Sequence, residues 1–141
     1  MDIGQIQDQI IRQFSALEDW MDRYEYLVHL GKNHTASDDS LKTDRNALEG
    51  CQSQVWITSE LKKNRVLFKA DSDSMITRGI LNLLLQVLND RPAEEIASAD
   101  LYFIEKIGLR TGLSPSRANG LSNIIRRLRN EGEAWTKKSG K

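Results

Sequence analysis

Cysteine is the scarcest chemically reactive residue in this sequence, because Cys51 is the only one among 141 residues. A single thiol cannot form an intramolecular disulfide, which favours a reducing compartment, and we expect a cytoplasmic protein. One cysteine cannot build a cysteine-rich metal site either, and His29 and His34 do not have ligand spacing relative to it. We therefore expect no bound metal.

Long apolar runs are missing as well. No segment reaches the roughly 20 apolar residues that cross a bilayer, so we expect no membrane association. The first residues, MDIGQIQDQIIRQF, are acidic and helical in pattern rather than a basic leader before an apolar block, so we expect no export signal. The sequence has neither internal repeats nor a linker. We expect residues 1–141 to form one globular domain with a flexible tail at 131–141.

Charge is balanced overall but unevenly distributed. The formal net charge is zero, yet acids predominate in residues 1–31 and bases in residues 115–141. The stretch RRLR at 126–129 and the lysine-rich tail are of the kind that attracts phosphate, which gives nucleic-acid binding as an alternative function. The neutral total and the lack of interleaved exposed aromatic residues favour a solvated helix face instead. We expect no nucleic-acid partner.

The usual catalytic motifs are also absent from the sequence. It has no glycine-rich phosphate loop, no HExxH and no clustered carboxylates. Asp71 and Asp73 are better explained as helix caps than as a catalytic pair. A thiol enzyme with its own substrate needs a histidine beside its cysteine. No motif surrounds His29 or His34, and we interpret both as surface or packing residues.

Two amphipathic helices are predicted in the first 31 residues. The apolar residues of the first recur at three- and four-residue spacing: Ile3, Ile6, Ile10, Phe14 and Leu17. Ser15 and Glu18 have the spacing of a capping box, so we expect the second helix to begin there after a kink. Gly31 suits the left-handed cap at its end.

A hairpin and a buried helix are predicted in the middle of the chain. Residues 54–59 and 65–70 have strand character, and the intervening KKN reads as their turn. Residues 75–88 are apolar on nearly every side, which is typical of a central helix. Shorter helices follow, and Ser114-Pro115 marks the start of the last one. The fold class is therefore α+β, a small antiparallel sheet with helices packed on one side.

Cys51 follows a long polar segment. Residues 32–50 show almost no apolar periodicity, and a connection of that length is often a functional loop. Gly50 lets the backbone turn tightly beside the sulfur, and Gln52, Ser53 and Gln54 argue against a fully apolar socket. Free cysteine is nevertheless among the most buried residue types. The residues themselves leave both a structural and a reactive Cys51 open.

Three blocks of the sequence resemble the SufE family of sulfur-acceptor proteins, including its CsdE group. They are NALEGCQSQVWI at 46–57, ADSDSMITRGIL at 70–81 and GLSPSRANGLSNIIRRL at 112–128. Their order and separation also fit, and the similarity extends over most of residues 1–130. The resemblance implies an α+β fold similar to the IscU-type scaffold, with the cysteine at a loop tip beside the sheet.

The resemblance also implies a function. Members of the family accept sulfur as a persulfide from a pyridoxal-phosphate cysteine desulfurase, here a SufS-like or CsdA-like one, and pass it to an iron–sulfur scaffold. The protein would then be an accessory partner that stimulates the desulfurase, not an enzyme, and would need no cofactor of its own. Its oligomeric state stays open between monomer and homodimer. The resting loop is expected to tuck the sulfur into a partly apolar cavity and to swing out on docking.

Individual residues acquire roles from the same resemblance. Cys51 is the persulfide acceptor, and Gly50 frees its turn. Arg117 either stabilises the anionic sulfur or shapes the surface that meets the partner, and the alternative is an ion pair at the start of the last helix. Asp73 either holds the cysteine loop closed or caps a helix, and capping is the favoured role. Further expectations concern hydrogen bonds at Gln52 and Gln54, sheet packing at Trp56 and close packing at Gly120.

Overall fold

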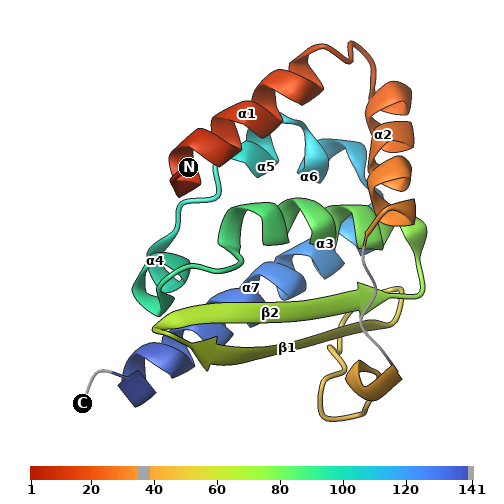
Figure 1. Ribbon diagram of the computed structural model, residues 1–141. Coiled ribbons are helices and arrows are strands. Elements are labelled where there is room, and N and C mark those ends of the chain that lie inside the picture. Colours follow the sequence, from red (N-terminus) through yellow and green to blue (C-terminus); the bar gives the residue numbers. More distant parts are fainter. Residues whose placement is uncertain (35–38, 140–141) are drawn as a thin grey trace.

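A two-stranded antiparallel sheet lies against a central helix in this computed structural model, which describes residues 1–34 and 39–139. Strands β1 (Val55–Lys62) and β2 (Arg65–Ser72) form a hairpin, and helix α3 (Met75–Leu88) packs above it (Figure 1). The hairpin turn at Lys63 and Asn64 has positive φ at both positions, as a two-residue type I′ turn requires. The predicted hairpin and the α+β class are confirmed.

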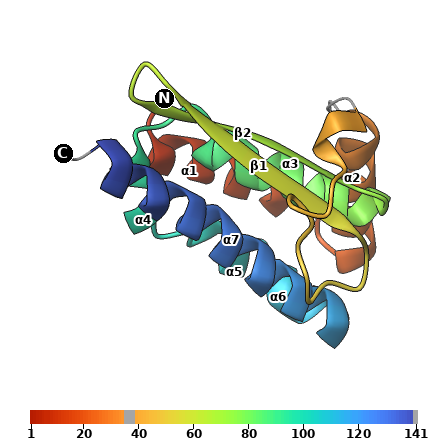
Figure 2. The same cartoon turned by 90° about the horizontal axis from the view of Figure 1, so that it is seen from below.

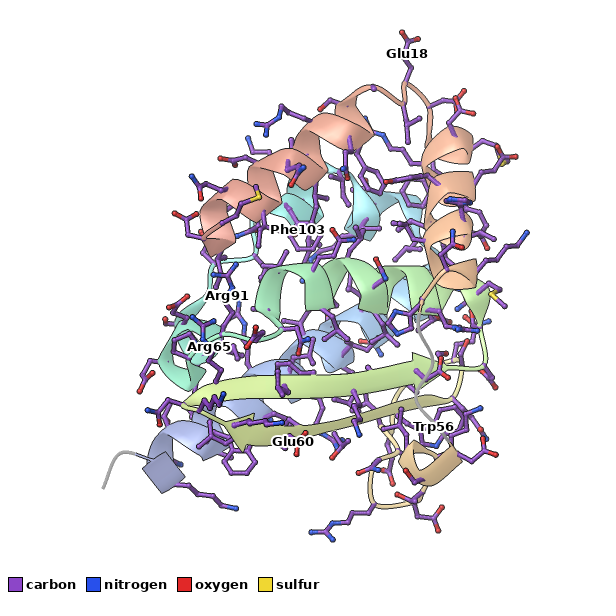
Figure 3. All side chains as sticks on the ribbon, in the orientation of Figure 1. Glu18, Trp56, Glu60, Arg65, Arg91 and Phe103 are labelled. Atoms are coloured by element: carbon purple, nitrogen blue, oxygen red, sulfur yellow. The ribbon has the colours of Figure 1, made fainter. Side chains whose placement is uncertain are left out.

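The other helices complete the fold, and α1 and α2 among them contact α3. They are α1 (Ile3–Ser15), α2 (Trp20–Lys32), α4 (Ala93–Ser98), α5 (Phe103–Lys106), α6 (Leu109–Gly112) and α7 (Pro115–Ser139). Helix α7 runs beside the hairpin (Figure 2) and contacts β1 and α4. The fully buried Phe103 lies between α1 and α3 (Figure 3).

Helix α3 carries the core, as its sequence predicts. Its inward residues are almost completely buried: Ile76, Ile80, Leu81, Leu83, Leu84, Val87 and Leu88. Ser74 is the N-cap of this helix, because its hydroxyl accepts a hydrogen bond from the Thr77 amide at 3.4 Å. The expectation that Asp71 and Asp73 cap a helix is therefore wrong. Asp71 is instead buried in β2 and pairs with Arg78 at 3.1 Å.

The boundary between the first two helices differs from the prediction. Helix α1 is capped by a capping box between Asp2 and Gln5 and ends at Ser15. Helix α2 begins after Asp19, whose carboxylate accepts from the Asp22 amide at 3.0 Å. The predicted capping box of Ser15 and Glu18 is thus wrong, because Asp19, four residues after Ser15, supplies the cap.

Gly31 is not a helix cap. It lies inside α2, where a Cβ atom would come within 2.0 Å of the Met75 carbonyl oxygen. Gly79 in α3 has the reciprocal position, because its Cβ would lie 2.0 Å from the Leu27 carbonyl oxygen. These two glycines let the backbones of α2 and α3 touch, so the predicted left-handed cap at Gly31 is wrong for a packing reason.

The segment between α2 and β1 is more structured than its polarity suggests. It contains the 3₁₀ turn η1 (Asp39–Leu41) and a bridge that pairs Ala47 with Trp56, while residues 35–38 lie outside the described residues. Trp56 lies beside η1 (Figure 3), and the Lys42 ammonium is 5.4 Å from its ring centroid. Helix α7 continues to Ser139, and residues 140–141 lie outside the described range; the flexibility of 131–141 stays a prediction.

Candidate functional site

Cys51 lies at the tip of a short loop whose ends are fastened to the sheet. At the base of the loop, the Leu48 amide donates to the Val55 carbonyl at 2.8 Å. On the outgoing side, the Gln54 amide donates to the Asp73 carboxylate at 3.0 Å, and the Ser72 hydroxyl donates to the Gln54 carbonyl at 2.7 Å. Because hydrogen bonds hold the loop at Leu48 and Gln54, only residues 49–53 project from this base, and they form the loop tip.

Gly50 sets the direction of this tip. Its φ is +84°, in the left-handed region that a residue with a Cβ rarely adopts. The Asn123 side-chain amide on α7 donates to the Gly50 carbonyl at 2.7 Å, and a Cβ on Gly50 would lie 2.5 Å from the same nitrogen. The backbone conformation therefore favours glycine at this position, and a Cβ there would displace the Asn123 amide group.

The Cys51 sulfur faces helix α7. It lies 3.7 Å from the Gly120 carbonyl oxygen, a long contact for a weak S–H donor. A Cβ on Gly120 would lie 3.5 Å from the sulfur, an ordinary van der Waals distance. Gly120 therefore lies against the cysteine, but the predicted need for a glycine to allow close packing is not confirmed.

A small cavity adjoins the sulfur. Its volume is about 20 Å³, which is enough for about one water molecule but not for an organic substrate. It is lined on the apolar side by Ile80, Leu121 and Ile124, and on the polar side by Thr77 and Arg117. The site therefore has room beside the sulfur for about one additional atom.

Burial of the sulfur raises the pKa of the Cys51 thiol. Desolvation disfavours the charged thiolate, so the closed loop holds the residue in its protonated, less nucleophilic form. The resting site therefore lowers the thiolate fraction of Cys51 rather than activating it.

The raised pKa gives a measurable pH dependence. We expect the rate of Cys51 alkylation by iodoacetamide to reach its midpoint at higher pH in the folded protein than in the same protein unfolded in urea. The folded state keeps the thiol proton to a higher pH than the unfolded state does. The contribution of this group to the free energy of unfolding is therefore fully present below the unfolded-state pKa and is lost as the pH rises through the folded-state pKa. Equal midpoints in the two states would contradict the burial of this thiol.

Arg117 lies on the cavity wall among hydroxyl groups. Its Nη1 atom lies 3.2 Å from the Ser53 hydroxyl, 3.2 Å from that of Ser74 and 3.0 Å from that of Thr77. Among the described residues no carboxylate forms a salt bridge with Arg117, so the ion pair considered from the sequence is wrong. The structure joins the cation to the cysteine loop through Ser53. A role in stabilising the anionic sulfur stays a prediction.

The other residues singled out from the sequence occupy different positions around the loop. The Asp73 carboxylate fixes the base of the loop through Gln54 and leaves capping to Ser74. Gln54 bonds through its backbone, while its side chain is exposed. Gln52 lines the cavity and is also exposed. The expected hydrogen bonds are therefore made by the backbone of Gln54.

Sequence reasoning missed Asn123 and the hydroxyl cluster of Ser53, Ser74 and Thr77. The available signal for Asn123 was its spacing, because it follows Gly120 by three residues and so lies on the same face of a helix. The hydroxyls come from the loop and from α3, and their approach to Arg117 depends on tertiary packing.

The histidines are separated from this chemistry. His34 is buried and bonds to the Ala70 carbonyl at 2.9 Å and to the Asn82 side chain at 3.3 Å, which confirms a packing role. His29 bonds to Asn33 at 3.1 Å on the same helix. Within the described part of the chain, the residues lining the Cys51 cavity include no histidine that would act as its base.

The arginines of the 126–129 stretch have structural partners. Arg127 donates to the Ile57 carbonyl at 2.8 Å and pairs with Glu131 at 3.2 Å, while Arg129 donates to the Ala99 carbonyl at 2.8 Å. These two guanidinium groups attach α7 to its neighbours. That occupation weakens the nucleic-acid interpretation, since phosphate binding draws on cations that are free to face it.

Metal-binding clusters and membrane-spanning helices are absent from residues 1–34 and 39–139. These ranges contain no group of histidine, cysteine, aspartate and glutamate side chains arranged to hold a metal ion. They contain no helix with the length and apolar character needed to cross a bilayer.

Comparisons with known proteins place this geometry in a family. The sequence model described as "SufE: Fe-S metabolism associated domain" matches residues 8–132. An uncharacterized SufE-like protein of Rhizobium meliloti is 40% identical over 89% of this chain and 94% of its own, and one of Rhizobium etli is 42% identical over 88% and 87%. The SufE-like protein 1, chloroplastic/mitochondrial, of Arabidopsis thaliana is 40% identical over 84% of this chain and 32% of its own length.

A solved structure supports the fold independently. The solution structure of a hypothetical protein from Thermus thermophilus has a TM-score of 0.73 and 16% identity, and the match covers 92% of this chain and 94% of that one. At that identity the likeness concerns the fold alone. Taken with the family match across residues 8–132, it leads to one conclusion: the chain belongs to the SufE family and has a role in iron–sulfur metabolism.

Proposed function

We propose that this protein accepts sulfur on Cys51 from a pyridoxal-phosphate-dependent cysteine desulfurase and relays it to iron–sulfur cluster assembly. The observation that carries the proposal is the position of Cys51, a lone thiol on a pinned loop beside a cavity with room for about one more atom. A site of this size suits a single transferred sulfur and excludes an organic substrate bound in the cavity.

The transfer is a thiol–disulfide type exchange. The Cys51 thiolate attacks the outer sulfur of the persulfide on the desulfurase cysteine, and the sulfur–sulfur bond of that persulfide breaks. A new bond forms to Cys51, and the desulfurase cysteine leaves as a thiolate. No oxidant or reductant is consumed, because the sulfane sulfur passes between two thiols.

Each partner has a separate part in this scheme. Pyridoxal phosphate stays on the desulfurase, so the acceptor needs no cofactor of its own. Emptying the desulfurase cysteine frees it for another cycle, which is how the protein would stimulate that enzyme without being one. A scaffold thiolate then removes the sulfur by the same exchange. A reducing compartment, for which we expect the cytoplasm, suits a single free thiol.

A mass measurement tests the proposal. The protein is incubated with free cysteine and a SufS-like desulfurase, and in a parallel sample with a CsdA-like one, before intact mass spectrometry without reductant. We expect the mass of one added sulfur with the cognate enzyme, removable by dithiothreitol. An unchanged mass with both enzymes, under conditions where each produces alanine, would contradict the proposed function.

A further inference from the structure

The closed position of the cysteine loop depends on few contacts beyond its base. The Asn123 amide reaches the Gly50 carbonyl at 2.7 Å, the Arg117 guanidinium reaches the Ser53 hydroxyl at 3.2 Å, and the Cys51 sulfur lies 3.7 Å from the Gly120 carbonyl. All three join the loop tip to α7. The bond from Asn123 is the shortest, and its partner is a backbone carbonyl that cannot rotate away without moving the loop.

We propose that Asn123 is a latch that controls access to Cys51. It is a positioning residue, because it touches the backbone immediately before the cysteine rather than the sulfur. With the latch closed, α7 covers one side of the sulfur; with it open, the tip formed by residues 49–53 is free to carry the sulfur outward.

The latch is oriented by a second side chain. The exposed Arg126 donates to Oδ1 of the Asn123 side chain at 3.0 Å, which leaves the side-chain Nδ2 directed at the Gly50 carbonyl. The positive φ of Gly50 turns its carbonyl to receive that bond. Residues on two segments that are 73 positions apart thus supply the donor, the acceptor and the orientation of this hydrogen bond.

The base of the loop would persist when the latch opens. The bonds from Leu48 to Val55 and from Gln54 to Asp73 lie outside the tip, so they need not break. Opening then requires the loss of the three contacts to α7 and of the packing of Cys51 against the core. For sulfur exchange this matters because the attacking and attacked sulfurs must meet directly, and the side of Cys51 facing α7 is blocked.

Alkylation of the free protein tests the latch without any desulfurase. We would measure the rate of iodoacetamide modification of wild type, Asn123→Asp and Asn123→Ala, with Asn130→Ala as an exposed asparagine control on the same helix. Because Cys51 is the only cysteine, the whole signal comes from it. Losing one hydrogen bond is expected to speed the reaction roughly two- to tenfold. The pH midpoint of Asn123→Ala should also fall toward that of the unfolded chain, whereas the carboxylate of Asn123→Asp opposes that fall by disfavouring the thiolate.

Asn123→Asp keeps the size of the side chain while removing the hydrogen-bond donor. Faster alkylation in this variant is therefore not explained by a loss of side-chain packing. Thermal unfolding of each variant identifies loss of the fold. Rates for both Asn123 variants that match wild type and Asn130→Ala, with melting temperatures unchanged, would overturn the latch. Faster alkylation in both, with Asn130→Ala unchanged, supports it.

The link to sulfur transfer rests on the proposed function and has its own readout. If the partner binds the open loop, the Asn123 variants should need a roughly two- to tenfold lower concentration for half-maximal desulfurase stimulation, with the maximal rate unchanged. Absence of stimulation even in wild type, together with faster alkylation in the variants, would contradict the proposed function and support the latch. Normal stimulation without any change in alkylation would overturn the latch alone.

Discussion

Cys51→Ser is expected to abolish both sulfur loading and desulfurase stimulation. Serine nearly preserves the size of the side chain and can still approach the Gly120 carbonyl, so the loop should close normally. Its hydroxyl is far less acidic than a thiol and does not form a persulfide. Since no second cysteine exists in the sequence, no other thiol can replace it. Intact mass spectrometry and alanine production measure the two losses on one set of samples.

The loop neighbour Ser53 provides the matched control. Ser53→Ala removes one hydroxyl contact of Arg117 but leaves the sulfur in place, so we expect sulfur loading to persist. Thermal melts of both variants establish that each is folded. Sulfur added to folded Cys51→Ser, at any site, would contradict Cys51 as the acceptor.

Gly31→Ala is expected to have the largest effect on stability. The new methyl group would overlap the Met75 carbonyl oxygen at 2.0 Å, and the obstacle is backbone rather than the flexible end of a side chain. Helices α2 and α3 would have to separate, which disturbs the core along the buried face of α3. We expect a loss of about 3 kcal/mol or more in the free energy of unfolding, at or beyond the upper end of overpacking effects.

Gly4→Ala is the matched control for that experiment. Gly4 is also helical, but its Cβ would make only ordinary contacts, the nearest at 3.5 Å from the Asp2 carboxylate. Replacing glycine by alanine in a helix then adds roughly 0.5–1 kcal/mol of stability. Urea denaturation of the three proteins gives the comparison. A Gly31→Ala variant as stable as wild type would show that the α2–α3 contact is not as close as described.

The sequence predicted the elements whose signals are local. The apolar residues of 75–88 indicated the buried α3, and the alternating residues around KKN indicated the hairpin. Ser114-Pro115 correctly marked the start of α7. The start of α2 was missed because Ser15 and Asp19 both offer caps, and local spacing does not decide between them. Gly31 was misinterpreted because its partner, the Met75 carbonyl, is distant in sequence.

The same division applies to the candidate site. The motif around Gly50 and Cys51 pointed to the reactive loop, and the structure adds the cavity and the long contact to Gly120. Asn123 had only one local signal, its spacing of three residues from Gly120, and that spacing does not distinguish it from other polar residues of the helix. Its importance depends on α7 lying beside the loop, which only the packing of the whole chain establishes.

The fastened base of the cysteine loop also limits where a partner's reactive group can be. Cys51 is three residues from each anchor, Leu48 and Gln54, so a fully extended tip carries its Cα roughly 10 Å from either one. The loop thus acts as a tether of fixed length, and under the proposed function the donor sulfur has to come to within that reach plus one side chain. A desulfurase whose cysteine is buried deeper than this would then have to extend a mobile segment of its own, so the length of the tip would limit which donors can react with Cys51.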